Sequence, residues 1–232
     1  MRILAFNVQP YEEKAFVKWA KDNDIKNGST VEVIMEKEKI IILPSKGFDG
    51  VTTQQVIPVK DEAVFDKLKE FGIKQIASRT AGVDMFGLDM AREREIAITN
   101  VPRYSPNAIA ELAVSHTMQL LRNVNRIRNA MSKGDFSWNK ELISREIRSC
   151  TVGIIGTGKI GLTTAQLFKG LGAKIIGYDK FRNPDAEGVL EYKDTVEELL
   201  KESDVVSLHL PLNDETYHLI DKEKIDMMKK GA

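Results

Sequence analysis

Three closely spaced glycines and a downstream aspartate are the residues of this chain best suited to do chemistry. Gly156, Gly158 and Gly161 follow the G-x-G-x-x-G spacing, an apolar run at 152–155 precedes them, and a second apolar run ends at Asp179. Such a loop turns a strand tightly into a helix, whose free N–H groups and partial positive charge bind phosphate. The pattern therefore predicts a site for the pyrophosphate and ribose of a dinucleotide.

Each glycine has its own physical role in such a loop. Gly156 permits the tight turn, Gly158 lets the backbone approach the pyrophosphate, and Gly161 lets the helix pack closely on the strand. The loop residues predicted to bind the cofactor are Gly156, Thr157, Gly158, Lys159, Ile160 and Gly161. The alternative is a glycine-rich turn in an unrelated α/β domain.

The aspartate indicates which dinucleotide the site prefers. Asp179 lies 18 residues after Gly161, at the end of the second apolar run. Its carboxylate can accept hydrogen bonds from both ribose hydroxyls and would repel a 2′-phosphate, so NAD is favoured over NADP. Lys180 and Arg182 leave the alternative open, because either cation could receive a phosphate.

Strand-like and helix-like patterns alternate along the chain, which predicts an α/β fold with parallel sheets. In the first part we expect strands at 2–8, 30–35, 51–55, 74–78 and 96–99, and helices at 10–21, 61–71 and 88–95. Residues 36–46 are ambiguous, because 40–43 could be a strand or a buried turn of helix. Two prolines make 100–107 a plausible crossover, so we predict domains at 1–101 and 102–232.

A long apolar helix is predicted to open the second domain. Residues 106–132 begin with Ser105 as N-cap and Pro106 in the first turn, and the apolar stripe is wide enough to be buried on two sides, one of which could be another subunit. Beyond it we expect strands at 151–155, 173–178, 189–192 and 204–208, and helices at 159–171, 195–202 and 222–229.

Composition excludes several classes of function. The 232 residues contain 34 Lys+Arg and 34 Asp+Glu, so no basic face for nucleic acid is implied. No apolar run approaches the length of a membrane span, and the apolar run at the first residues is too short for a signal peptide. Cys150 cannot form an internal disulfide, and no Cys/His cluster has metal-ligand spacing. We therefore expect a soluble, cytoplasmic protein with no metal site.

Several motifs, in this order, resemble the D-isomer-specific 2-hydroxyacid dehydrogenases, and within that family the bacterial D-lactate dehydrogenases. They are residues 79–84 (RTAGVD), 100–111 (NVPRYSPNAIAE), 151–161 (TVGIIGTGKIG) and 208–212 (LHLPL), supported by 135–138, 144–148 and 178–184. The resemblance implies two Rossmann-like or flavodoxin-like parallel-sheet domains, a cleft between them and a homodimer, here through helix 106–132. It covers almost the whole chain.

The resemblance also implies roles for particular residues. Ala81 and Gly82 would offer backbone N–H groups to the substrate carboxylate, and Tyr104 would reach the substrate from the interdomain side. His209 and Pro211 would line the adenosine part of the NAD site. Two further positions near the crossover, Asn107 and Glu111, would help to position substrate or nicotinamide.

The family's catalytic arginine, glutamate and histidine have no match among these residues. By the resemblance all three would lie beyond Ala232, with the last strands of the second domain and a returning helix, so we expect that domain to be incomplete here. His116 is expected to be a packing or interface residue, and His218 a surface or structural one. Neither is predicted to replace the catalytic histidine, and nor is His209.

The predicted function is NAD-dependent reduction of a 2-oxo acid, with pyruvate to D-lactate as the first choice. Hydride would pass from NADH to the keto carbon while a protonated histidine donates a proton. The alternative is a non-catalytic relative that binds NAD(H) as a sensor or regulator. We expect a small 2-oxo or 2-hydroxy acid as substrate and no nucleic acid or membrane as partner.

Overall fold

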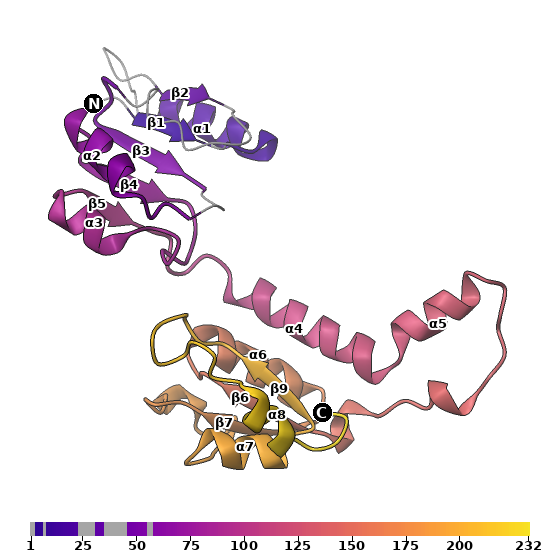
Figure 1. The fold of residues 1–232 in the computed structure, drawn as a ribbon. Helices are drawn as coiled ribbons and strands as arrows, with labels where there is room; N and C mark the ends of the chain where they lie inside the picture. The colour runs from indigo at the N-terminus through magenta and orange to yellow at the C-terminus, as the bar shows by residue number, and fades with distance from the viewer. Residues whose placement is uncertain (1–2, 7, 23–30, 35–45, 55–57) are drawn as a thin grey trace. The chain divides into compact units, whose positions relative to one another are not determined.

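The computed structural model describes residues 3–6, 8–22, 31–34, 46–54 and 58–232, and divides the chain into two compact units, Met1–Tyr104 and Ser105–Ala232. Each unit has its own parallel sheet (Figure 1). Most of the ambiguous segment at 36–46 lies outside the described residues.

The first unit holds a five-stranded sheet in the order β2-β1-β3-β4-β5, all parallel, which is the flavodoxin-like order. Its elements are β1 (Ile3–Phe6), α1 (Pro10–Asp22), β2 (Val31–Ile34), β3 (Gly50–Thr53), α2 (Glu62–Glu70), β4 (Gln75–Ser78), α3 (Leu88–Glu93) and β5 (Ala97–Thr99). Helix α2 begins where the Asp61 carboxylate accepts from the amide of Ala63, and it buries Phe65 in the core beside Leu4 and Ile76.

The second unit holds a four-stranded parallel sheet in the order β8-β7-β6-β9, the arrangement of a Rossmann half-domain with one strand of the next half. After helices α4 (Pro106–Leu121) and α5 (Val124–Met131) come β6 (Thr151–Ile155), α6 (Lys159–Gly170), β7 (Lys174–Tyr178), β8 (Glu191–Tyr192), α7 (Val196–Glu202), β9 (Val205–Leu208) and α8 (Lys222–Met227). Short 3₁₀ turns stand at Lys140–Leu142, Ile147–Ser149 and Pro184–Ala186.

The α/β prediction is confirmed, whereas the single helix predicted at 106–132 is wrong. That helix breaks at Asn123, whose φ of 53° and ψ of 29° are left-handed. Asparagine tolerates this conformation, and its side-chain amide donates to the carbonyl of Ile143 at 3.2 Å. The apolar pattern runs on across the break, and no glycine or proline marks it, so periodicity alone predicts one helix.

Burial in the second unit follows the apolar runs. Val152, Ile154 and Ile155 of β6 are fully buried, and Phe168 of α6 packs in the same core as Val152 and Ile154. Gly153 is needed inside this strand because a Cβ there would lie 2.2 Å from the Ser203 hydroxyl oxygen. Among the described helices, none is long and apolar enough to cross a membrane.

Asp204, immediately before β9, connects several parts of the second unit. Its carboxylate accepts from the amide of Thr151 at 2.8 Å and pairs with Arg145 at 3.0 Å and Lys229 at 3.3 Å. Burial alone would raise the pKa of Asp204, but these donors outweigh burial and lower it. The carboxylate therefore anchors the sheet to the segments before and after it.

Candidate functional site

Three predicted site positions come together at the carboxyl edge of the second sheet. Ile155 of β6 is in register with Tyr178 of β7 and Leu208 of β9, so the residues that follow, Gly156, Asp179 and His209, leave the sheet side by side. The chain runs from β6 to β7 on one side and reaches β9 on the other, so β6 and β9 flank the topological switch point. Ligands of open α/β sheets bind at this point.

Gly156 and Gly161 are required by the backbone of this loop itself. Gly156 has φ of 90°, donates its amide to the carbonyl of Tyr178 at 2.9 Å, and has no room for a Cβ, which would lie 2.5 Å from the carbonyl oxygen of His209. A Cβ on Gly161 would lie 1.9 Å from the carbonyl oxygen of Gly156. These two glycines allow the strand, the loop and α6 to pack together.

Gly158 differs, because nothing in the protein requires its lack of a side chain. It is exposed, its φ of −64° suits any residue, and no heavy atom of the described chain lies within 4 Å of the position of a Cβ. It is the N-cap of α6, and no described side chain caps this helix end. The first-turn amides, which begin with Lys159 and Ile160, therefore have no side-chain acceptor in the described chain, and they can bind an anion such as a pyrophosphate.

The Asp179 carboxylate stands beside this loop and is held by three donors. Its Oδ2 accepts from the amide of Thr157 at 2.6 Å and from the Thr157 hydroxyl at 3.2 Å, and its Oδ1 accepts from the amide of Phe181 at 3.0 Å. Thr157 is fully buried while Asp179 is half-buried. A carboxylate has about four acceptor positions, so one remains for a ribose hydroxyl without loss of these bonds, and shared acceptance allows a second.

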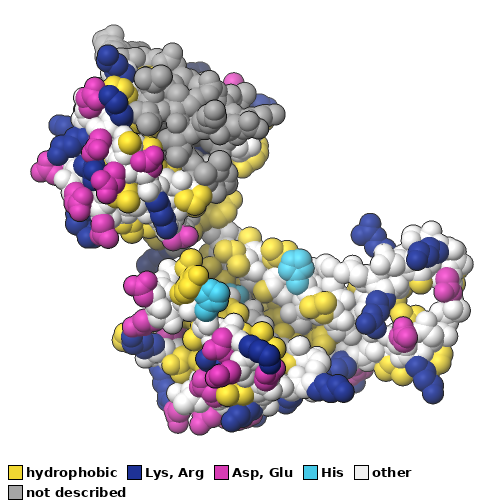
Figure 2. All heavy atoms as spheres, viewed as in Figure 1, with side chains coloured by type: hydrophobic (Ala, Val, Ile, Leu, Met, Phe, Trp, Pro, Cys, Tyr) yellow, Lys and Arg dark blue, Asp and Glu magenta, His cyan; other side chains and the backbone are white. Residues whose placement is uncertain are grey.

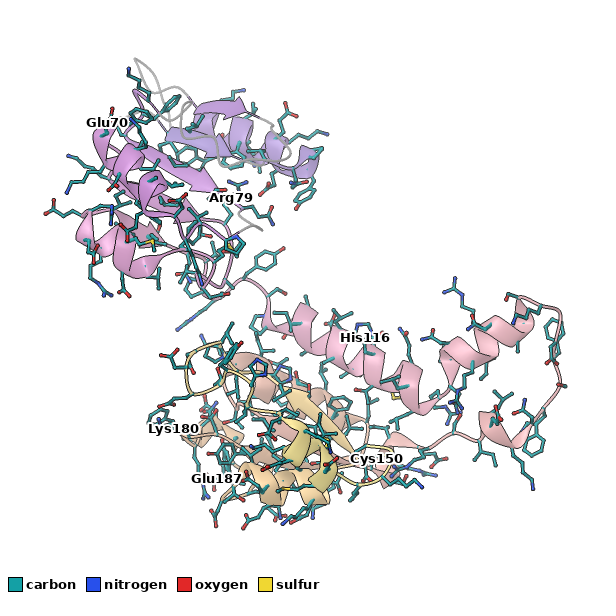
Figure 3. The ribbon with its side chains drawn as sticks, in the orientation of Figure 1. Glu70, Arg79, His116, Cys150, Lys180 and Glu187 are labelled. Carbon is teal, nitrogen blue, oxygen red and sulfur yellow. The ribbon has the colours of Figure 1, made fainter. Side chains whose placement is uncertain are left out.

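The two cations next to Asp179 are already paired. Lys180, in the loop that follows β7 (Figure 3), contacts the Glu215 carboxylate at 2.7 and 2.9 Å. Arg182 pairs with Asp194 and stacks over the ring of Tyr192 at 5.3 Å. Each cation is thus already neutralised by a carboxylate, which makes it less attractive to a 2′-phosphate and agrees with a preference for NAD.

His209 follows β9 with its backbone in the sheet and its ring half-buried. Its amide donates to the carbonyl of Ile155 at 2.8 Å, and its Nε2 lies 2.9 Å from the Ser207 hydroxyl. Burial lowers the pKa of His209 from its ordinary value near 6.5, so the ring is neutral at pH 7. Pro211 is exposed two residues further on, and its carbonyl accepts from the Thr216 hydroxyl at 2.6 Å.

Ala81 and Gly82 lie in the first unit, in the loop after β4. Both are exposed, and within the described part of the chain neither amide donates a hydrogen bond. Two side chains hold the loop through its carbonyl groups. The side-chain amide of Asn100 donates to the carbonyl of Ala81 at 2.6 Å, and the Thr80 hydroxyl donates to the carbonyl of Gly82 at 2.7 Å. Two free amides on a braced loop can bind a carboxylate.

The remaining candidates are exposed side chains outside the loop segment. Tyr104 ends the first unit with 83% of its surface exposed, and Asn107 and Glu111 are exposed on α4. His116, labelled in Figure 3, is exposed on α4 and so is not packed inside the unit. His218 is exposed with φ of 52° and its ring touches Tyr217 edge to face. The structure thus brings together the cofactor candidates of the second unit, while Ala81, Gly82 and Tyr104 belong to the first.

Sequence reasoning missed two residues that support the cofactor loop. The side-chain amide of Asn183 donates to the carbonyl of Thr157 at 2.8 Å, and the Tyr192 hydroxyl lies 2.7 Å from the Thr157 hydroxyl. Asn183 stands in the stretch 178–184 that carries part of the family resemblance, so a signal for it existed. Nothing in the sequence around Tyr192 connects it with a loop 35 residues earlier.

Comparison with known families identifies the group. The model of the D-isomer specific 2-hydroxyacid dehydrogenase NAD binding domain matches residues 114–232, and that of the catalytic domain of the same family matches residues 3–164. The chain belongs to the D-isomer-specific 2-hydroxyacid dehydrogenases. It is therefore an NAD-dependent oxidoreductase chain, and the predicted family and cofactor are confirmed.

Individual relatives agree with this assignment. The chain is 45% identical over its full length to a D-2-hydroxyacid dehydrogenase (NAD(+)) of Clostridioides difficile, of which it covers 69%, and 43% identical to a D-lactate dehydrogenase of Staphylococcus aureus, of which it covers 68%. Among solved structures it matches the D-lactate dehydrogenase TP0037 of Treponema pallidum with a TM-score of 0.81 and 38% identity, covering 99% of this chain and 68% of that one. It matches an NAD-complexed dehydrogenase of Lactobacillus delbrueckii with a TM-score of 0.77 and 38% identity, covering 100% and 69%.

Proposed function

We propose that the chain forms part of a D-lactate dehydrogenase, which reduces pyruvate to D-lactate with NADH. The observation that carries the proposal is the arrangement at the carboxyl edge of the second sheet, where an uncapped helix end and the Asp179 carboxylate flank open space above Gly158. The choice of pyruvate rests on the relatives named as D-lactate dehydrogenases, at 43% identity and below.

The bound cofactor supplies the hydride, and the residues of this chain bind and orient. The first-turn amides of α6 hold the pyrophosphate, Asp179 accepts from the ribose hydroxyls, and His209 and Pro211 border the adenosine. These roles follow from the positions of the residues around β6 and from the family resemblance. The neutral His209 ring brings no positive charge to that border.

On the substrate side, the free amides of Ala81 and Gly82 bind part of the substrate carboxylate, and the exposed Tyr104 contacts the substrate. The cation that completes the carboxylate clamp, and the histidine that donates the proton, are the residues expected after Ala232. A protonated acid positioned at the ketone oxygen raises the rate because it stabilises the charge that develops there.

Absorbance of NADH, followed with pyruvate, phenylpyruvate and 2-oxoglutarate in turn, tests the proposal, together with chiral analysis of the product. We expect the full gene product to prefer pyruvate and to yield the D-isomer, and residues 1–232 alone to bind NADH without turnover. Preference for another 2-oxo acid would show that pyruvate is not the substrate. If both proteins bind NADH and neither turns it over, the result favours the alternative of a non-catalytic NAD(H) sensor. Turnover by residues 1–232 alone would refute the expectation that the proton-donating histidine lies after Ala232.

We also propose that two copies of the chain associate through α4, α5 and the segment after them. This surface carries exposed apolar side chains, namely Ile109, Leu112, Leu120, Val124, Ile127, Met131, Phe136, Trp138 and Ile143. Figure 2 shows hydrophobic side chains along the visible side of α4. Apolar patches of this extent on a folded protein usually mark an interface, because their exposure to water is unfavourable.

Leu120→Glu tests this interface, because Leu120 is 76% exposed and a carboxylate there would be buried on association. We expect the mass in light scattering to fall from that of a dimer to that of one chain. Ile225→Glu is the matched control, because Ile225 on α8 is also exposed, at 56%, and this substitution should leave the mass unchanged. A cytoplasmic location completes the proposal, and the single, buried Cys150 supports it.

A further inference from the structure

The Tyr192 hydroxyl belongs to a series of hydrogen bonds that runs from the Asn183 amide to Asp179. The amide of Asn183 donates to the Tyr192 hydroxyl at 2.8 Å, which lies 2.7 Å from the Thr157 hydroxyl, which in turn lies 3.2 Å from Oδ2 of Asp179. Tyr192 comes from β8, a strand of two residues at the edge of the sheet. It therefore reaches the cofactor loop from the other side of β7.

The direction of every bond in this chain is fixed by chemistry. An ionised carboxylate only accepts, so the Thr157 hydroxyl must donate to Asp179. Having one proton, the Thr157 hydroxyl must accept from Tyr192, and a backbone amide only donates, so Tyr192 accepts from Asn183. All the donors thus point toward Asp179, and hydrogen bonds aligned in this way polarise and strengthen one another.

Packing leaves the Thr157 side chain little freedom to turn away. Its methyl group would lie 3.3 Å from a Cβ added to Gly177, the residue in register with Tyr192, so it packs against the bare backbone of β7. Thr157 is fully buried, so its hydroxyl has no access to water as an alternative partner. Loss of the Tyr192 hydroxyl would leave an acceptor position of Thr157 empty.

We infer that Tyr192 is a positioning residue for the cofactor: through Thr157 it orients the Asp179 carboxylate toward the adenosine ribose. In this role Tyr192 would act through Thr157 and not by contact with the cofactor. This inference rests on the proposed role of Asp179 in binding the ribose. The alternative is that the hydroxyl only attaches β8 to the sheet, in which case its removal changes stability but not the selectivity of binding.

The test measures binding of NADH and of ADP-ribose to the chain by calorimetry, so it needs no turnover. We expect Tyr192→Phe and Thr157→Val each to raise both dissociation constants about 3- to 10-fold, because each substitution breaks the series of hydrogen bonds that orients Asp179. Both substitutions break the same series of hydrogen bonds. The double variant should therefore bind no more weakly than the single variant with the lower affinity. Tyr178→Phe is the control, since its hydroxyl has no hydrogen bond within the described residues.

Asp179→Ala separates this inference from the role on which it rests. It should raise the dissociation constants about 10- to 100-fold, because a hydrogen bond to a charged group is lost. In that background Tyr192→Phe should change binding less than twofold. An equal effect of Tyr192→Phe with and without Asp179, or none with it present, would overturn the inference alone. Unchanged binding in Asp179→Ala would overturn the ribose role and the inference with it.

Discussion

Replacement of Gly158 by alanine should separate cofactor binding from folding. No heavy atom of the described chain lies within 4 Å of the added Cβ, and the backbone φ of −64° suits alanine. In the bound state, however, this methyl group would occupy the space into which we place the pyrophosphate. The fold should therefore accept the substitution while the ligand does not.

The structure sets the size of both effects. Alanine restricts the unfolded chain, which stabilises by about 0.4–1 kcal/mol, but it is a poorer N-cap than glycine by a similar amount. The free energy of unfolding should thus change by less than about 1 kcal/mol. An extra methyl group in a close contact costs about 1–3 kcal/mol, which raises the dissociation constant of NADH about 5- to 150-fold.

Titration calorimetry with NADH and urea unfolding together measure the two quantities. Gly170→Ala is the matched control, because Gly170 ends the same helix and also has no heavy atom within 4 Å of an added Cβ. It should leave NADH binding unchanged. Normal NADH affinity in Gly158→Ala would refute the close approach of the cofactor to the Gly158 backbone. A large loss of stability would refute the conclusion that the protein leaves room for a Cβ at this position.

Three further predictions follow from the same structure. Gly161→Ala should cost about 3 kcal/mol or more in urea unfolding, because its Cβ would lie 1.9 Å from the backbone carbonyl of Gly156, and near-normal stability would contradict that packing. His209 has a lowered folded-state pKa, so the free energy of unfolding should fall as the pH drops below about 6.5, and His209→Gln should reduce this slope. Asp204→Asn should lower the free energy of unfolding by about 1–3 kcal/mol at pH 7, because hydrogen bonds to a charged group are lost. The difference in this free energy between the variant and the parent protein should shrink as the pH falls below about 4, since the carboxylate has a lowered folded-state pKa. A difference that persists at low pH would exclude the charge as its cause.

The sequence determines those features that depend on neighbours along the chain. The strand into Gly156, the uncapped start of α6 and the acid at Asp179 follow from the local alternation of apolar runs, glycines and helix patterns, so they could be predicted. The two α/β units follow for the same reason. The glycine spacing in this pattern predicts where the loop backbone must approach a ligand or a neighbouring strand closely.

Only the tertiary structure decides which distant side chains meet. Tyr192 reaches Thr157 because β8 pairs with β7 in one particular register, and Lys180 is paired because the loop after β9 places Glu215 within 2.7 Å. The break at Asn123 likewise depends on a hydrogen bond to a residue 20 positions away. Strand order and long-range hydrogen bonds leave little trace in local periodicity, since each is set by packing between segments far apart in the sequence.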